Sequence, residues 1–211
     1  LIKEVWKWAM RKKYIAFNPE LPFQDENLKS DDKVSRPTWT DKEWKSFSAK
    51  IRYWRERQEE KTQEVAWDSY VAYQMIFVLV NSGLRIGELC KLRRKDITFF
   101  TVEEEHTRTR WQIGELGCLI EVHKSTKTGE RTVNALCGKW VKNVMDKSKY
   151  KKKSDFLFCY SDGTRFTTER FRRIFERMCD YAYLREDCDK DDWKELVPYS
   201  LRSLYATTRL Q

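Results

Sequence analysis

Two segments that lie far apart in the chain each contain an arginine at an expected helix start. Residues 81–89 contain Arg85, and residues 198–207 contain Arg202. A guanidinium group offers a rigid fork of hydrogen-bond donors, so two that converge can hold one phosphate and neutralise charge on its oxygens. Lys127, in a tight turn between two expected strands, could protonate a departing oxygen. These residue types suit metal-free cleavage of a phosphodiester, although their wide separations do not link them without a fold.

Four segments, in this order, resemble the signature motifs of the tyrosine recombinase (phage integrase) family. Ser-Gly-Leu-Arg-Ile-Gly-Glu-Leu at 82–89 is similar to the first arginine motif, and Lys-Ser-Thr-Lys-Thr-Gly-Glu-Arg-Thr-Val at 124–133 to the catalytic-lysine hairpin. The turn Ser-Asp-Gly at 161–163, before a basic helix, is similar to the element that precedes the second arginine motif. Tyr-Ser-Leu-Arg-Ser-Leu-Tyr-Ala-Thr at 199–207 resembles that second motif. Each match is weak alone, but the ordered set is specific and covers residues 37–211.

The resemblance implies a role for each of these residues. Arg85 and Arg202 would hold the scissile phosphate, and Lys127 would be the general acid for the 5′-oxygen. Glu88, three residues after Arg85 on the same helix face, would orient its guanidinium group. Two alternatives stay open at this stage: Lys124, on the same hairpin, is a rival for the acid, and the Arg85–Glu88 pair could be a plain surface ion pair.

The chain departs from the family pattern in its last motif. Tyr199 stands where the family usually has a histidine, and a phenol can donate a hydrogen bond to a phosphate but is a poor proton shuttle at neutral pH. Ser203 stands where a second histidine is frequent. The family's next histidine or tryptophan and its nucleophilic tyrosine would follow Gln211, and Tyr205 is expected in the core. The sequence therefore predicts that these residues alone cannot cleave DNA unless a longer protein supplies the nucleophile.

The elements that would position these residues are mostly helices. Thr-Asp-Lys-Glu at 40–43 is a capping box, which predicts a helix to about residue 61. Residues 64–81 are apolar nearly all round after residue 72, which is typical of a central core helix. A break at 82–83 then begins another helix over 85–91, with Arg85 beside its N-terminus.

Between residues 96 and 135 the pattern changes to that of strands. Turns fall at 114–117 and 127–130, which predicts an antiparallel sheet of three strands. The strand-like residues are Trp111, Ile113, Leu119, Ile120, Val122 and Val133. Further helices are expected over 138–146 and 168–183, and near 198, where Ser200 is the expected N-cap. We therefore expect an α+β, mainly helical fold, which the resemblance identifies as the tyrosine-recombinase catalytic-domain fold.

The first part of the chain has a different character. Residues 2–13 carry apolar side chains at helical spacing, whereas residues 20–37 are polar and have no clear period, as expected of a linker. With the resemblance, we expect residues 1–19 to be the end of a core-binding domain, its last helix, and 20–37 to be the interdomain linker. Residues 38–211 would be the catalytic domain, without its C-terminal helices.

Composition agrees with a nucleic-acid partner. Lys and Arg number 42 against 33 Asp and Glu, a formal net charge of +9, which favours a polyanion, although an ordinary solvated basic surface is the alternative. We expect Lys124, Arg165, Arg170 and Arg173 to contact DNA, with a plain solvated helix face as the alternative. The six cysteines form no C-x-x-C pair and the chain has two histidines, so we expect reduced thiols, no metal site and no cofactor. No apolar run approaches the length of a membrane helix.

The expected function follows from the resemblance. It implies a site-specific DNA recombinase or integrase of a phage or mobile element, which cleaves and rejoins double-stranded DNA through a 3′-phosphotyrosyl intermediate, without metal or ATP. It would act as a homotetramer in the host cytoplasm, associated with the nucleoid. Three alternatives are a non-catalytic DNA-binding relative, a type IB topoisomerase-like enzyme, and a basic helical scaffold that binds RNA or protein.

Overall fold

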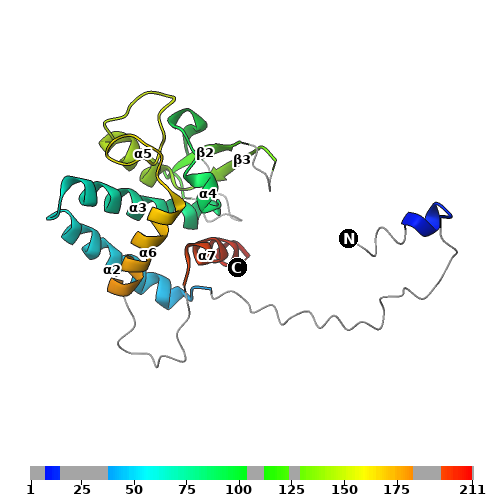
Figure 1. Ribbon diagram of the computed structural model, residues 1–211, viewed down its shortest axis with the longest axis horizontal. Helices are drawn as coiled ribbons and strands as arrows, with labels where there is room; N and C mark the ends of the chain where they lie inside the picture. The colour runs from blue at the N-terminus through cyan, green and yellow to red at the C-terminus, as the bar shows by residue number, and fades with distance from the viewer. Residues whose placement is uncertain (1–7, 15–37, 104–111, 124–128, 183–195, 211) are drawn as a thin grey trace. The chain divides into compact units, whose positions relative to one another are not determined.

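The computed structural model describes residues 8–14, 38–103, 112–123, 129–182 and 196–210, with residues 208–210 as backbone only. The chain divides into two compact units, Leu1–Arg36 and Pro37–Gln211. In the first unit, residues 8–11 form a short helical turn. The expected linker, residues 20–37, lies outside the described residues. All the elements described below belong to the second unit (Figure 1).

Two long helices open the second unit, α2 (Asp41–Gln58) and α3 (Gln63–Ser82). The capping box at the start of α2 is present, because the Thr40 amide donates to the Glu43 carboxylate and the Glu43 amide donates to Thr40 Oγ1. Helix α3 is buried on nearly every side in its middle turns and contacts α2, α5, α6 and α7. The prediction of a central core helix is therefore confirmed.

The turn after α3 depends on a glycine. Gly83 has φ 63°, a left-handed conformation that L side chains rarely adopt, and it ends α3. A Cβ atom on Gly83 would lie 2.4 Å from Cδ1 of Tyr205, so the ring of Tyr205 lies directly against this turn. A short helix, α4 (Ile86–Leu89), and a 3₁₀ turn, η1 (Arg94–Asp96), follow.

The expected three-stranded antiparallel sheet is confirmed. Its strands are β1 (Ile97–Thr101), β2 (Leu116–Val122) and β3 (Arg131–Ala135), in the order β1-β2-β3. Ile120, in the middle strand, is fully buried on the face toward the helices. The strand prediction was wrong for Ile113, which lies in the turn before β2 and is 64% exposed, because Gly114 with φ 85° reverses the chain there. Trp111 lies outside the described residues.

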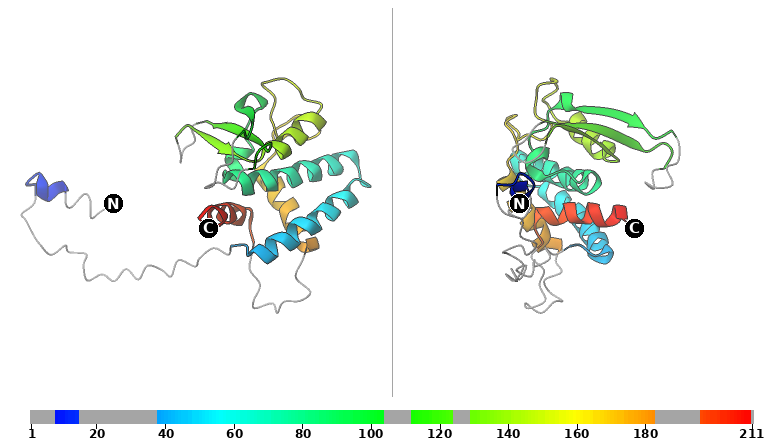
Figure 2. Two further views of the ribbon diagram at one scale, coloured as in Figure 1. Left: turned by 180° about the vertical axis from the view of Figure 1, so that it is seen from behind. Right: turned by 90° about the vertical axis from the view of Figure 1, so that its right-hand side faces the viewer.

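Among the described residues of this unit, three more helices follow: α5 (Gly138–Lys147), α6 (Thr168–Ala182) and α7 (Pro198–Leu210). The sheet and α5 lie on one side of α3, whereas α2, α6 and α7 lie on the other (Figure 2). Figures 1 and 2 place α7 beside the end of α3 that leads into α4, and α3 and α7 are in contact. The two expected arginine motifs are thus carried by neighbouring elements.

The predicted N-cap of α7 is off by three positions. The helix begins at Pro198, which suits a first helical position because proline has no amide hydrogen to lose. Ser200 therefore lies within the first turn, where its buried Oγ accepts a hydrogen bond from the Val197 amide at 3.3 Å. This is the reciprocal bond of a capping box, with Val197 in the cap position.

Candidate active site

Arg85 lies at the N-cap of α4, directly after the α3 turn. Its amide donates to Glu88 Oε2 at 3.0 Å, and its guanidinium Nη1 donates to Glu88 Oε1 at 3.2 Å. The Arg85 side chain remains 39% exposed, whereas that of Glu88 is only 5% exposed. Glu88 therefore fixes both the backbone and the side chain of Arg85, and its burial distinguishes this contact from a plain surface ion pair.

A second arginine, which sequence reasoning did not single out, binds the same carboxylate. Arg131, the first residue of β3, donates from Nη1 to Glu88 Oε1 at 3.2 Å and from Nη2 to Glu88 Oε2 at 2.7 Å. This bidentate geometry is the strong form of an arginine–carboxylate contact. One buried carboxylate thus joins α4 to the strand that follows the lysine hairpin, and two guanidinium groups against one carboxylate leave the site positively charged.

Arg202 approaches the same region from α7. It lies one helical turn before Tyr205, whose ring covers Gly83. The Arg202 side chain is half-buried, and its Nη1 is a buried donor without a hydrogen-bond partner among the described residues. Buried polar groups are nearly always hydrogen-bonded in proteins, so an orphan guanidinium donor beside Arg85's turn is a feature that a bound anion would satisfy.

Tyr199 and Tyr205 occupy different environments on α7. Tyr199, in the first turn, is 46% exposed. Tyr205 is half-buried and lies against Gly83, which agrees with an expected role in packing. Of the two, only Tyr199 has a side chain open enough to solvent to meet a large ligand.

Lys127 and Lys124 lie outside the described residues. The residues on either side of their expected hairpin are described, and each contacts a buried carboxylate. At the end of β2, His123 Nε2 lies 2.9 Å from Oδ1 of Asp96, a carboxylate that is 1% exposed and also accepts the Arg93 amide at 2.8 Å. At the start of β3, Arg131 binds Glu88.

The three arginines expected to contact DNA have different surroundings. Arg170 donates from Nε at 3.0 Å and from Nη2 at 2.9 Å to Oδ2 of Asp68, a carboxylate of α3 that is 2% exposed. Arg173 is 63% exposed and donates to Glu169 on its own helix. Arg165 is exposed and precedes α6. Arg170 therefore holds α6 to the central helix, and Arg165 and Arg173 lie on the surface.

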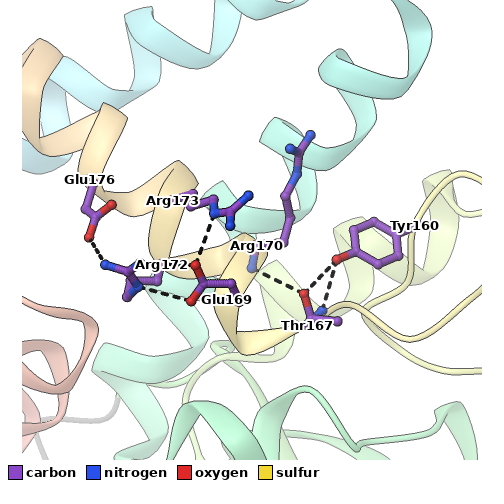
Figure 3. Close-up of polar contacts among 7 residues, drawn as sticks. All are labelled: Tyr160, Thr167, Glu169, Arg170, Arg172, Arg173 and Glu176. Carbon is purple, nitrogen blue, oxygen red and sulfur yellow. Dashed lines mark hydrogen bonds and ion pairs between the residues drawn. The ribbon is translucent and has the colours of Figure 1, made fainter.

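The exposed face of α6 is a network of charges of both signs. Figure 3 shows Arg172 and Arg173 pointing toward Glu169, with Arg172 also reaching Glu176, whereas the Arg170 side chain extends away from them. Hydrogen bonds from Arg172 and Arg173 lower the pKa of Glu169, so its charge is present at neutral pH. A phosphate would have to compete with Glu169 for these two arginines.

Other site chemistries have less support in the described residues. In the ranges that the structure describes, no three His, Cys, Asp or Glu side chains gather as a metal site would need. The described cysteines are buried free thiols, and burial raises the pKa of Cys90 to about 12, so that this thiol stays protonated. None of the described helices is long and apolar enough to cross a lipid bilayer.

The fold defined by the central helix, its flanking helices and the small sheet is that of a tyrosine-recombinase catalytic domain. The sequence pattern of the Phage integrase family matches residues 55–210, and the chain belongs to that family. The matched range contains Arg85, Glu88, Arg131 and Arg202.

This chain spans between 38% and 63% of the length of three proteins to which it is similar. A protein of Sinorhizobium fredii (strain NBRC 101917 / NGR234) named as an integrase/recombinase, y4rE, is 29% identical over 139 residues, which are 64% of this chain and 38% of that protein. The structure of the XerH recombinase bound to its difH substrate has a TM-score of 0.54 at 20% identity, over 81% of this chain and 42% of that one. The structure of the Tn1549 integrase in complex with transposon right-end DNA has a TM-score of 0.54 at 19% identity, over 98% of this chain and 63% of that one.

Proposed function

We propose that this chain is the catalytic domain of a site-specific DNA recombinase of the integrase type. The observation that carries the proposal is the pair of guanidinium groups beside one turn: Arg85, fixed by the buried Glu88, and Arg202, whose Nη1 has no partner among the described residues. In this proposal Arg85 and Arg202 hold the scissile phosphate, and Arg131 positions Arg85 through Glu88.

The chemistry proposed for the complete protein is a transesterification. A tyrosine, supplied by residues beyond Gln211, attacks phosphorus as its phenolate, and the bond from phosphorus to the 5′-oxygen breaks. Lys127 protonates that oxygen, and the 3′-phosphotyrosyl bond is later reversed by the 5′-hydroxyl of the joining strand. Preorganised donors that meet charge as it develops supply the main part of such catalysis. Tyr199 donates a hydrogen bond to the phosphate and holds it in place.

Double-stranded DNA is the proposed partner. The similar structures of XerH and the Tn1549 integrase contain DNA, and this chain carries a net charge of +9. Most of the affinity would come from contacts with phosphates. We further propose a homotetramer on DNA for strand exchange, within the host cytoplasm at the nucleoid.

The test uses the full-length protein, including residues beyond Gln211, and a randomised pool of nicked duplexes, since a nick traps the covalent intermediate. We expect a protein–DNA adduct that survives denaturing electrophoresis. Arg85→Ala or Arg202→Ala should lower its rate of formation by about 10²- to 10³-fold. Arg131→Gln should lower it by about ten-fold or more because Arg85 loses its alignment, and Arg131→Lys should recover part of the loss. Arg172→Ala, on the exposed face of α6, is the matched control.

A second candidate is a non-catalytic DNA-binding relative, which Tyr199 in place of the usual histidine favours. Full-length protein that binds duplex DNA but forms no adduct with any member of the pool would support this candidate and exclude the first. Relaxation of a supercoiled plasmid by a monomer, without a preferred site, would instead indicate topoisomerase-like activity. For the 211-residue chain alone we expect DNA binding and no adduct.

A further inference from the structure

A second site candidate lies at the other end of the central helix. It is a cavity of about 380 Å³, within the range of small-molecule sites. The residues that line it come from the end of α2, the first turns of α3, the end of α5 and the loop before α6: Glu59, Gln63, Ala66, Trp67, Tyr70, Lys147, Lys149, Tyr150, Tyr160 and Ser161. Along α3, Tyr70 and Ser82 are separated by about 18 Å at 1.5 Å per residue, so this cavity is distinct from the Arg85 site.

Aromatic rings form the walls of this cavity, which we name the aromatic cavity. The rings of Trp67 and Tyr70 are stacked, with centroids 5.9 Å apart and an angle of 28° between their planes. Tyr150 and Tyr160 complete the walls. Four aromatic side chains around one space offer ring faces on which a further planar ring can stack.

The polar atoms of these four side chains are already used within the protein. Trp67 Nε1 donates to the Cys159 carbonyl at 2.9 Å, and Tyr70 OH to the Asn143 carbonyl at 3.1 Å. The Tyr150 hydroxyl donates a hydrogen bond to the Ser161 carbonyl at 3.1 Å. The Tyr160 hydroxyl is hydrogen-bonded to Thr167 Oγ1 at 2.8 Å (Figure 3). Because these bonds fix the rings, a ligand would meet preformed faces and cause little reordering.

Two lysines give the mouth of the cavity a positive charge. The ammonium group of Lys147 lies 4.4 Å from the Tyr70 ring centroid, and that of Lys149 lies 5.3 Å from the Tyr150 ring centroid. Within the described part of the chain, neither lysine is ion-paired. Among the described residues that line the cavity, the one carboxylate is that of Glu59, whose Oε1 lies 3.8 Å from Nη2 of Arg55. Asp162 interacts electrostatically with Lys149 without forming an ion pair. An anionic group of a ligand can therefore meet two ammonium groups that make no ion pair with a described carboxylate.

We propose that the aromatic cavity binds a nucleotide. Its base stacks on the faces of Trp67 and Tyr160, and its phosphate lies between Lys147 and Lys149. Gln63 and Glu59 at the edge can accept hydrogen bonds from the amino groups of a base. A simple anion would leave the aromatic walls uncovered, and an uncharged aromatic molecule would leave the two ammonium groups without an ion pair. The nucleotide can be free in solution or belong to a single strand of nucleic acid.

The test is calorimetric titration of the full chain at low salt with deoxyadenosine monophosphate. Deoxyadenosine, which lacks the phosphate, and inorganic phosphate, which lacks the base, are the comparison ligands. We expect saturable binding of one molecule per chain, tighter than that of either comparison ligand. Binding no tighter than that of inorganic phosphate, or no saturable binding, would overturn the proposal.

Two variants locate the site. Lys147→Gln combined with Lys149→Gln should weaken binding by at least about ten-fold, whereas Lys152→Gln, an exposed lysine of the same loop outside the cavity, should leave it unchanged. Ala66→Phe, which fills the cavity from α3, should abolish nucleotide binding. Unaltered affinity in both the double variant and Ala66→Phe would overturn the proposal, with circular dichroism as the check on folding.

A final comparison identifies the source of the nucleotide. A single-stranded tetranucleotide that binds more tightly than the monophosphate indicates a site for a DNA or RNA strand, and weaker binding indicates a free nucleotide. Neither arm depends on strand cleavage, so the outcome is independent of the function proposed above.

Discussion

Glu88 is the residue on which the geometry of the arginine site depends. Its carboxylate is 5% exposed and accepts hydrogen bonds from both Arg85 and Arg131. A carboxylate removed from water is tolerated only when it is paired and hydrogen-bonded, and here both conditions are met. Without that charge, two guanidinium groups would face each other across α4 and β3.

We therefore expect Glu88→Gln to lower the free energy of unfolding by about 2 kcal/mol, since hydrogen bonds to charged groups contribute about 1.5 to 3 kcal/mol. Urea unfolding followed by circular dichroism measures the change. Glu169→Gln is the matched control, because that carboxylate also binds two arginines but is exposed, and we expect no measurable change there. Equal effects of the two substitutions would show that burial at Glu88 is not decisive.

Asp68 is a buried carboxylate whose ionisation opposes folding. Its side chain is 2% exposed, and Oδ1 has no hydrogen-bond partner among the described residues. Burial raises the pKa of Asp68, although the guanidinium of Arg170 acts in the opposite direction. The folded state therefore holds this proton to a higher pH than the unfolded chain does. The Asp68 contribution favours folding below the unfolded pKa and is lost as the pH rises through the folded value.

Comparison with Asp68→Asn isolates this titration. Asparagine keeps an acceptor for Arg170 but does not ionise, so we expect the unfolding free energy of the wild type, relative to the variant, to fall as the pH rises above about 4. Urea unfolding of both proteins at a series of pH values measures this difference in unfolding free energy. Asp162→Asn should show the opposite sign, because hydrogen bonds from Thr164 lower the pKa of the exposed Asp162. A pH-independent difference for Asp68 would contradict the prediction.

The turn between α3 and α4 sets the position of α7. Gly83 has φ 63°, and a Cβ atom there would meet the Tyr205 ring at 2.4 Å. Gly83→Ala thus combines backbone strain with displacement of α7, and we expect it to destabilise the domain by about 2 kcal/mol. Since Arg202 lies one turn from Tyr205, the same change should also weaken DNA binding.

Gly87→Ala is a matched control four residues away. A Cβ atom on Gly87 would meet nothing within 4 Å, and Gly87 lies in α4, where alanine is favoured by up to about 1 kcal/mol. We expect unchanged or slightly higher stability, as measured by thermal unfolding. Equal losses at Gly83 and Gly87 would mean that the contact with Tyr205 does not determine how α7 is placed.

Local patterns were sufficient for most elements and insufficient for contacts between them. The capping box at Thr40, the buried helix α3 and the turn at Gly83 are encoded by neighbouring residues, and their predictions are confirmed. Ile113 was misassigned because strand-like composition outweighed the adjacent glycine. Arg131 was missed because its partner, Glu88, lies 43 residues away in sequence. No helical or strand period reports such a contact, which depends on how β3 packs beside α4.

The same limit applies to the basic surface of the whole domain. The sequence led us to expect that Arg165, Arg170 and Arg173 all contact DNA, but the structure separates these arginines by their partners. Arg170 binds the buried Asp68, whereas Arg173 is exposed and paired with Glu169 on the same helix. Neutralising Arg170 would therefore remove a structural contact as well as a charge. Only exposed positions can report on DNA binding without a change in stability.

Salt dependence can decide whether this surface meets DNA. Each phosphate contact contributes about 0.9 to the slope of log K against log salt concentration, so Arg165→Gln combined with Arg173→Gln should reduce the slope by about 1.8 if both residues contact DNA. Fluorescence anisotropy with a labelled duplex, over a series of salt concentrations, measures this slope.

Arg172→Gln is the control, because the Arg172 guanidinium is held by Glu169 and Glu176, and it should change the slope least. An unchanged slope in the double variant would assign Arg165 and Arg173 to the solvated face, and the positive charge that binds DNA would then lie beside Arg85 and Arg202.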